Sequence, residues 1–202
     1  MTYQLIFPEL ANALYLALKE DGFYQTMEAS VDASAETKRL AMLAYMDYSI
    51  IEAKEYGRCF IPKQHYGVSI WSCPLSDQQE SSKTQQKKQF IIRHMGEKSL
   101  QAYQAMCEFM SQQSTDLVDN NAWYLSIIGI LPEYQGQGLG PGLVESILAE
   151  ADELGVVSYL ETFTPRNMSF YQRLGYESLG DFLEPLSQSR YWVMQRQSKP
   201  IA

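Results

Sequence analysis

Residues 132–141, PEYQGQGLGP, carry the strongest fold signal in the chain. The apolar run 123–130 before them is typical of a strand, and the segment 139–154 after them has the apolar spacing of an amphipathic helix. Three glycines within five residues let backbone N–H groups converge on an anion at the helix start, where the helix dipole adds about half a positive charge. The stretch therefore predicts a loop that holds phosphate groups, with a diphosphate as the natural ligand.

Two common nucleotide-binding motifs do not fit this loop. A P-loop needs Gly-Lys-Ser/Thr, which is absent, and a dinucleotide fingerprint needs a glycine where Pro141 or Leu143 stands. The glycines alone leave open a second interpretation, a turn without any ligand. Pro141 has no N–H, so one donor to the phosphates is missing, at a cost of ~1.5–3 kcal/mol at most.

Predicted strands and helices alternate around the loop, so we expect an α/β fold with a mixed sheet. In the second half, strands are expected at 156–161, 176–182 and 190–196, with a short helix at 167–174. In the first half, the pattern predicts a strand over 3–7, helices from Pro8 to Asp21-Gly22, over 34–57 and over 100–110, and a hairpin of 58–61 with 66–71. The polar segment 76–89 predicts a surface loop or frayed helix and a candidate mobile flap.

Length and composition limit the class of protein. The chain has 202 residues, 46% of them apolar, which fits a single domain over 1–202. A net charge of −8 argues against nucleic acid as a partner. The three cysteines are scattered, which suggests neither a disulfide framework nor a metal site and favours a cytoplasmic location. No apolar run is long enough to cross a membrane.

Two ordered motifs resemble those of the GNAT superfamily of N-acetyltransferases. The first is the loop at 135–140, QGQGLG, which matches Gln/Arg-x-x-Gly-x-Gly/Ala, and the second runs from Leu160-Glu161-Thr162 to residues 165–176. Within the superfamily the chain is most similar to the puromycin N-acetyltransferase branch, because it shares the Trp123 strand start and the closing Arg-x-Trp-x-Met-x-Arg at 190–196. The resemblance is strong over about 122–196.

This resemblance implies a mostly antiparallel, twisted sheet with a central splay between two parallel strands, flanked by helices. Acetyl-CoA would lie in the splay, held by the part 122–196, while 1–121 would form the acceptor side. The pantetheine amides would pair with backbone groups that an opened ladder leaves free. The residues expected to bind the cofactor are Ile128, Gly129, Ile130, Gln135, Gly136, Gln137, Gly138, Leu139, Gly140 and Asn167.

Acetyl transfer to an amine needs a neutral amine and a protonated or stabilised leaving thiolate. Tyr171 is the predicted acid, because the family places this helix beside the sulfur and a phenol is protonated at neutral pH. The strand 123–130 has no carboxylate, although many relatives carry a Glu there, so Glu161 is the nearest candidate base. Two readings of Glu161 remain open: it accepts the proton directly or through water, or it only fixes the adjacent loop.

The predicted function is acetyl transfer from acetyl-CoA to a small primary amine by direct attack in a ternary complex, without metal. Two alternatives remain: a non-catalytic acyl-CoA sensor, and an acetyltransferase for protein lysines or N-termini. A homodimer is possible, because sheet-mediated dimers are frequent in the superfamily. Four aromatic residues are candidates for the wall of the acceptor pocket, namely Tyr24, Tyr45, Tyr48 and Trp71.

Overall fold

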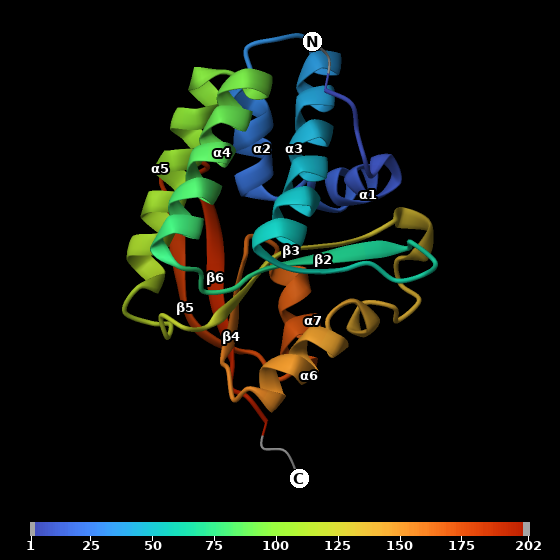
Figure 1. The fold of residues 1–202 in the computed structure, drawn as a ribbon, viewed down its shortest axis with the longest axis vertical. Coiled ribbons are helices and arrows are strands. Elements are labelled where there is room, and N and C mark those ends of the chain that lie inside the picture. The colour runs from blue at the N-terminus through green and yellow to red at the C-terminus, as the bar shows by residue number, and fades with distance from the viewer. Residues whose placement is uncertain (1–2, 200–202) are drawn as a thin grey trace.

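The computed structural model describes residues 3–199, in which a twisted sheet lies between two groups of helices (Figure 1). Within this range the sheet has six strands in the order β1-β2-β3-β4-β6-β5. Strands β3 and β4 are parallel, and all other neighbouring strands are antiparallel. The predicted α/β fold with a mixed, mostly antiparallel sheet is confirmed.

Three helices precede the first strand, and strands and helices then alternate in groups, with short 3-10 turns in the second half. The strands are β1 (Gly57–Phe60), β2 (Gly67–Ser72), β3 (Trp123–Ile130), β4 (Ser158–Thr162), β5 (Glu177–Glu184) and β6 (Ser189–Arg196). The helices are α1 (Pro8–Leu18), α2 (Gly22–Ser30), α3 (Ala35–Tyr56), α4 (Asp77–Met95), α5 (Glu97–Ser114), α6 (Glu145–Glu153) and α7 (Met168–Arg173). The 3-10 turns are η1 (Pro132–Tyr134), η2 (Pro141–Leu143) and η3 (Pro165–Asn167).

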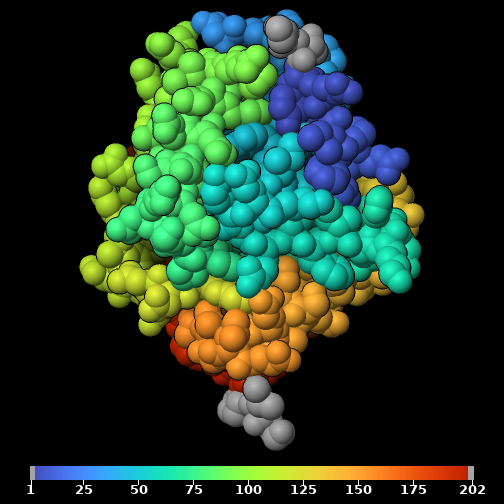
Figure 2. Space-filling model, viewed as in Figure 1, coloured from blue at the N-terminus to red at the C-terminus, as the bar shows by residue number. Residues whose placement is uncertain are grey.

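The helices divide between the two faces of the sheet according to their order in the chain. In Figure 1, α1 to α5 lie above β2 and β3, and α6 and α7 lie below them. The apolar residues of the upper layer pack with Val68, Ile70 and Ile127, whereas Leu125 and Leu160 pack with α6 and α7. Figure 2 shows the blue, cyan and green helices covering most of one face, with α6 in orange beneath them.

A β-bulge in the middle of β3 changes which face its side chains reach. The register with β2 shifts between Ile70 and Trp71, so Ser126 is the extra residue of β3. Leu125 and Ile127 are two residues apart and would share a face in a regular strand, yet they join different hydrophobic clusters. The bulge therefore bends β3 where it leaves β4.

Residues 77–89 lie in α4 and Ser76 is its N-cap, so the segment is helical, as one of the two predicted possibilities had it, and the predicted surface loop is wrong. Ser76 caps the helix: its hydroxyl accepts from the N–H of Gln79, and the Gln79 side chain accepts from the N–H of Ser76. This capping box satisfies two donors at the helix start, and the Gln, Lys and Glu residues that follow have good helix propensity. Their polarity reflects exposure, while Lys87 and Phe90 face inward.

The predicted strand over 3–7 is also wrong. The buried carboxylate of Asp47 accepts hydrogen bonds from the N–H groups of Ile6 and Phe7, at 3.0 and 2.6 Å, and from the Tyr3 hydroxyl at 2.8 Å. A side chain thus satisfies backbone donors that a sheet would otherwise take, and the segment lies on α3. Distant partners of this kind leave no local pattern in the sequence.

Two features of the helices differ from the sequence prediction. The helix from Pro8 ends at Leu18, before Asp21-Gly22 as predicted, but Asp21 also caps a helix that was not predicted, α2, by accepting from the N–H of Phe23 at 3.0 Å. The helix predicted over 139–154 begins only at Glu145, because the 3-10 turn η2 comes first and Val144 has a φ of −123°. The glycine loop therefore leads into η2, and the dipole of α6 begins further along the chain than predicted.

Candidate active site

The parallel strands β3 and β4 separate after a short paired segment. The pairing runs from Trp123 opposite Ser158 to Leu125 opposite Leu160 and then stops. Beyond this point β3 continues to Ile130 along β2, whereas β4 stays paired with β6. The structure thus contains the splay that the sequence resemblance implies, between strands that are parallel.

The hydrogen bonds between β2 and β3 show which backbone groups face this splay. Leu131 donates its N–H to the carbonyl of Tyr66 at 2.9 Å. Bonded and non-bonded pairs alternate along antiparallel strands, so Gly129 is bonded to β2, and the N–H and C=O of Ile128 and Ile130 point the other way. Two of the three predicted strand residues therefore present backbone groups to the splay, and Gly129 does not.

The glycine loop presents a row of free N–H groups. Gly136 and Gly138 have φ values of +74° and +75°, which only glycine adopts without strain. Within residues 3–199, no backbone N–H from Gly136 to Gly140 donates a hydrogen bond to the protein. Backbone amides of this kind, unshielded by Cβ atoms, are suited to an anionic ligand.

The two glutamines of the loop fold back onto the backbone. Gln135 donates from Nε2 to the carbonyl of Ile130 at 2.9 Å, and Gln137 donates to the carbonyl of Glu133 at 2.7 Å. Their side chains therefore hold the shape of the loop. Because the Ile130 carbonyl is already used by Gln135, the free groups at the splay are the N–H of Ile130 and both backbone groups of Ile128.

The loop lies against the segment that carries the predicted acid. A Cβ placed on Gly140 would come within 2.7 Å of the Phe170 ring, so the loop backbone touches α7 closely. Tyr171 is buried and lines the same cleft as the loop, as do Leu139 and the exposed Asn167. Burial is the largest of the effects that raise the pKa of the Tyr171 phenol above its ordinary value, so the phenol stays protonated at neutral pH.

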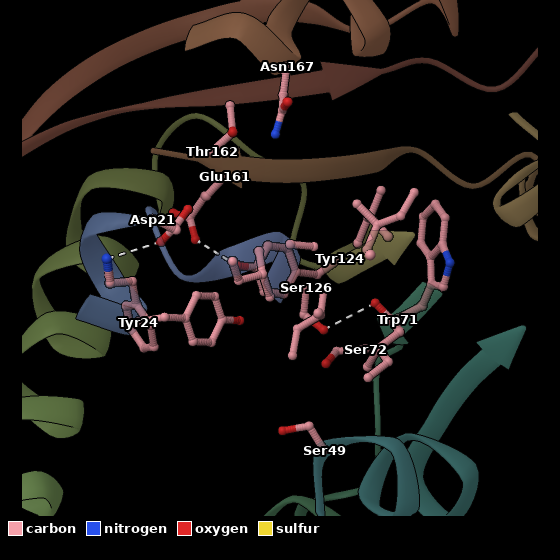
Figure 3. Close-up of a pocket in the computed structure, with 18 of the residues that line it drawn as sticks. Asp21, Tyr24, Ser49, Trp71, Ser72, Tyr124, Ser126, Glu161, Thr162 and Asn167 are labelled. Carbon is pink, nitrogen blue, oxygen red and sulfur yellow. Dashed lines mark hydrogen bonds between the residues drawn. The ribbon is translucent and has the colours of Figure 1, made fainter. Parts of the chain in front are cut away.

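Glu161 lies on β4, beyond the point where the strands separate. Its Oε2 accepts a hydrogen bond from the Tyr124 hydroxyl at 3.0 Å, and its Oε1 is buried without a partner (Figure 3). Burial raises the pKa of the carboxyl to about 7, although the Tyr124 hydrogen bond lowers it. Tyr124 is itself stacked on Tyr159, with ring centroids 4.7 Å apart. Glu161 thus offers one fixed and one vacant oxygen.

One cleft of about 930 Å³ is lined by the end of β3, the glycine loop, Tyr171, Asn167 and Glu161, and it also reaches between the N-terminal helices. Gln137 is the one predicted cofactor residue that is not part of its wall. Tyr24, Tyr45 and Trp71 line it as predicted, whereas Tyr48 is not part of its wall. In Figure 3 the Tyr24 hydroxyl points from α2 into the space between Tyr124 and Ser49.

The sequence analysis missed Asp21 as a cleft residue. Its carboxyl lines the cleft, and burial raises its pKa to about 6. The only local signal was its place before Gly22, which is equally typical of a helix cap. Tyr103 and Cys107 of α5 also line the cleft, and the helical pattern there indicated only a buried face.

Residues 3–199 show no cluster of three or more His, Cys, Asp or Glu side chains that could hold a metal ion. In the same range, no helix combines the length and the apolar character that a membrane crossing requires.

Several solved structures share the fold over nearly the whole chain. A structure described as histone acetyltransferase HPA2 and related acetyltransferase from Corynebacterium glutamicum superposes with a TM-score of 0.65 and 17% identity, over 97% of this chain and 93% of that chain. A polyamine N-acetyltransferase of Drosophila melanogaster gives a TM-score of 0.55 and 15% identity, over 92% of each chain. Arylalkylamine N-acetyltransferase 2 of Aedes aegypti gives 0.55 and 11%, over 97% of this chain and 98% of that one.

At such low identities these likenesses establish the fold alone. The family is established by the sequence model of the acetyltransferase (GNAT) family, which matches residues 65–176 and so includes β2, the splay, the glycine loop and α7. More than half of the chain matches, and the matched part contains both motifs of the sequence analysis. The chain therefore belongs to the GNAT acetyltransferase family and is an acetyl-CoA-dependent transferase.

Proposed function

We propose that this enzyme transfers an acetyl group from acetyl-CoA to the primary amine of a small molecule, by direct attack in a ternary complex. The observation that carries the proposal is the vacant, buried Oε1 of Glu161, at the point where β3 and β4 separate and in the same cleft as Tyr171. Bringing an amine and a thioester together there can lower the barrier by ~7–11 kcal/mol.

The donor side of the cleft fits acetyl-CoA. The free N–H groups from Gly136 to Gly140 would bind the diphosphate, and Gln135 would hold the loop in position. The vacant backbone groups of Ile128 and Ile130 suit the pantetheine amides. Asn167, exposed on the cleft wall close to α7, would bind the same cofactor. Gly129 would act through the close packing of its backbone on α1, since a Cβ there would lie 2.7 Å from Leu14.

Glu161 would remove the proton from the incoming ammonium, whose ordinary pKa is ~10. Its pKa of about 7 leaves it largely ionised just above neutrality and still basic enough to accept a proton in the transition state. Tyr124 holds Oε2, so Oε1 is the oxygen that would accept the proton, directly or through one water. These contacts favour the catalytic reading of Glu161 over a purely structural one.

Tyr171 would donate its proton to the departing thiolate. Burial raises the pKa of this phenol, so it is protonated at neutral pH and would donate a strong hydrogen bond to the thiolate as negative charge develops on the sulfur. The burial of this side chain excludes bulk water, which strengthens such a hydrogen bond.

Three features support a small amine as the acceptor. The cleft passes between helices rather than along an open surface, and Asp21 and Glu161 place two carboxyl groups in its wall. The polyamine and arylalkylamine N-acetyltransferases with the same fold are named for small amines. Lysine side chains or N-termini of proteins remain the alternative acceptors. The division into an acceptor side, 1–121, and a donor side, 122–196, in one domain is part of the same proposal.

The finer placement in the puromycin branch is also a proposal, supported by Trp123 at the start of β3 and by the Arg-x-Trp-x-Met-x-Arg run of β6. Acetylation of puromycin by the purified enzyme would support it, and a lack of turnover would argue for another branch. The possible homodimer is tested by the mass of the particle in solution.

The proposed function is tested by measuring CoA release from acetyl-CoA with a panel of primary amines and with lysine peptides. Calorimetry with acetyl-CoA on the same preparation shows whether the donor site is competent. Turnover with small amines is the expected result. Turnover with peptides alone would favour the protein acceptor, and tight acetyl-CoA binding without any turnover would favour an acyl-CoA sensor.

A further inference from the structure

The cleft continues beyond Glu161 and Tyr171 to a second pair of charged residues between α3 and α4. Glu52 of α3 and Lys87 of α4 both line it and form an ion pair of 3.0 Å, Nζ to Oε2. Only 12% of the Glu52 side chain and 10% of the Lys87 side chain are exposed. Burying two charges is costly unless their remaining hydrogen-bonding capacity is satisfied. A buried pair in the wall of a substrate cleft therefore needs an explanation.

The Lys87 side of this pair is well surrounded. Its Nζ lies 4.9 Å from the ring centroid of Tyr45 and 5.0 Å from that of Tyr48, so two aromatic faces stabilise the ammonium. The Glu52 side is less complete, because Oε1 is buried and accepts no hydrogen bond of normal geometry, and the hydroxyl of the adjacent Tyr48, a potential donor to Glu52, is also buried without a partner. Buried polar atoms almost always have a partner in native proteins. An acceptor without one on a cleft wall indicates a donor that arrives with a ligand.

Aromatic side chains occupy the wall between the reaction centre and this pair. Tyr24, Tyr45 and Tyr103 meet edge to face, with centroid distances of 6.4 Å for Tyr24 and Tyr45 and 6.5 Å for Tyr45 and Tyr103. All three line the cleft. Ring faces and edges of this kind favour an apolar or aromatic body over a hydrated one.

The two ends of the cleft differ in charge. At the reaction centre, neither Asp21 nor Glu161 forms an ion pair with a Lys or Arg of residues 3–199. At the far end, Lys87 balances Glu52, and the nearby lining residues Glu80 and Lys83 of α4 also carry opposite charges. One end thus favours a cation, and the other favours a group without net charge.

We propose that the acceptor is a primary amine with a single positive charge, an apolar or aromatic body, and an uncharged hydrogen-bond donor at its far end, which donates to Oε1 of Glu52. A hydroxyl or an amide N–H has this chemistry. A second cation would be repelled by Lys87 and would lose its hydration on entering the cleft, so a diamine fits less well. This inference rests on the proposed function and specifies its substrate class.

Length-matched amines test the proposal with the intact enzyme and acetyl-CoA. The probes are alkylamines from butyl to octyl, the amino alcohols with a terminal hydroxyl and the corresponding diamines, together with phenethylamine and tyramine as an aromatic pair. At the best length, the amino alcohol should exceed the alkylamine in kcat/KM by about tenfold, in line with one hydrogen bond to a charged group. The diamine should fall below the amino alcohol by a similar factor.

Two variants then change the charge of the far end. In Lys87→Met, Glu52 has lost its counterion, so the ratio of diamine to amino alcohol in kcat/KM should rise by about tenfold or more. In the double variant Glu52→Gln with Lys87→Met, the far end is uncharged. The ratio of amino alcohol to alkylamine in kcat/KM should then fall to about threefold or less. The double variant buries no isolated charge, so it remains informative if Lys87→Met does not fold.

Asp32→Asn with Lys98→Met is the matched control, because that ion pair of 2.8 Å is exposed and does not line the cleft. Circular dichroism and acetyl-CoA affinity report the integrity of every variant. Either of two results would overturn this inference alone. In the first, the enzyme acetylates amines without a preference for a terminal hydroxyl at any length. In the second, the double variant retains that preference. Failure to acetylate any amine would instead overturn the proposed function, and the inference with it.

Discussion

The two sides of the cleft are built from different parts of the polypeptide. The proposed donor side consists mainly of backbone groups, in the splayed end of β3 and in the loop 135–140, within a short and continuous stretch of sequence. The acceptor side consists of side chains from α2 to α5, such as Asp21, Tyr45 and Tyr103, which are far apart in the chain. The first surface depends on chain conformation, and the second depends on residue identity.

This difference explains which half of the molecule identifies the family. Backbone recognition requires glycines at a few positions and tolerates change elsewhere, so its motif persists in the sequence. The family model matches 65–176, which leaves α1, α2 and α3 outside. An acceptor wall of side chains can change with the substrate without disturbing the donor site, and the variants below test this separation.

The largest effect is expected from Glu161→Gln, which removes the proposed base and keeps the shape of the side chain. We expect kcat/KM to fall by about 10²–10⁴-fold, the usual contribution of a general base. The wild-type kcat/KM should rise with pH through about 7 as the carboxyl ionises, and this acid limb of the pH profile should be absent in the variant. Acetyl-CoA affinity, measured by calorimetry, should stay within about twofold, because Glu161 is assigned to the acceptor.

Glu177→Gln, at an exposed position on β5, is the control for the same chemical change and should leave the rate unchanged.

The Tm of Glu161→Gln distinguishes a catalytic role of this residue from a structural one. The pKa of Glu161 is raised in the folded state, so that state binds more protons, and ionisation destabilises it as pH rises toward 7. Glu161→Gln should therefore have a higher Tm than the wild type at pH 8. A lower Tm together with lost activity would point to a structural role.

Tyr171→Phe should have the next largest effect. Removing the hydroxyl leaves the thiolate without its hydrogen-bond donor, so we expect kcat to fall by about 10–10²-fold, the effect of one hydrogen bond to a charged group. Acetyl-CoA affinity should change little, since the ring still fills its buried position next to Phe170 and Tyr176. Wild-type turnover in this variant, measured by CoA release, would reject the acid assignment. Tyr176→Phe is the matched control, because its hydroxyl is bonded to Ser158, away from the cleft.

Gly138→Ala tests the backbone character of the donor side. Gly138 has a φ of +75°, so alanine would be strained by about 1–3 kcal/mol and the loop would shift. Acetyl-CoA should bind about tenfold more weakly by calorimetry. Gly155→Ala places the same strain at a φ of +67° in the turn before β4, outside the cleft, and should cost stability without affecting binding. Equal loss of affinity in both variants would contradict a phosphate-binding loop.

The sequence predicted β3, the loop with its glycines and most of α6, because their determinants are local. The spacing of the glycines, the alternation of β3 and the amphipathic pattern of α6 each depend on neighbours a few residues away. The missed coil at the N-terminus depends on long-range contacts: Asp47 takes the backbone donors of Ile6 and Phe7 across about forty residues, which converts an expected strand to coil.

The acceptor side could not be predicted for the same reason. Asp21 is a helix cap by its local pattern, and Lys87 stands in a polar run that is typical of a solvated surface. Their roles in the cleft depend on the packing of α2 to α5 over the sheet, which no spacing in the sequence encodes. Aromatic residues were better indicators, since three of the four predicted wall residues do line the cleft.

The smallest effect is expected from Tyr124→Phe, which separates the position of Glu161 from its chemistry. The Tyr124 hydroxyl donates to Oε2 and lowers the pKa of the carboxyl against the effect of burial. Without this hydrogen bond the pKa should rise, so the acid limb of kcat/KM should move to higher pH by less than about one unit, and the rate at neutral pH should fall several-fold. Activity should recover at pH 9, where Glu161 is ionised in both proteins.

Recovery at high pH is what distinguishes a positioning role from a catalytic one. If Tyr124 itself carried the proton, its removal would lower the rate at every pH. If it served only as packing, the phenyl ring would keep the stack on Tyr159, and the limb would not move. A shift to lower pH would show that the hydrogen bond stabilises the neutral carboxylic acid instead. The hydrogen bond would then add to the effect of burial in raising the pKa of Glu161, so Tyr124 would keep the carboxyl protonated at neutral pH instead of favouring its basic form.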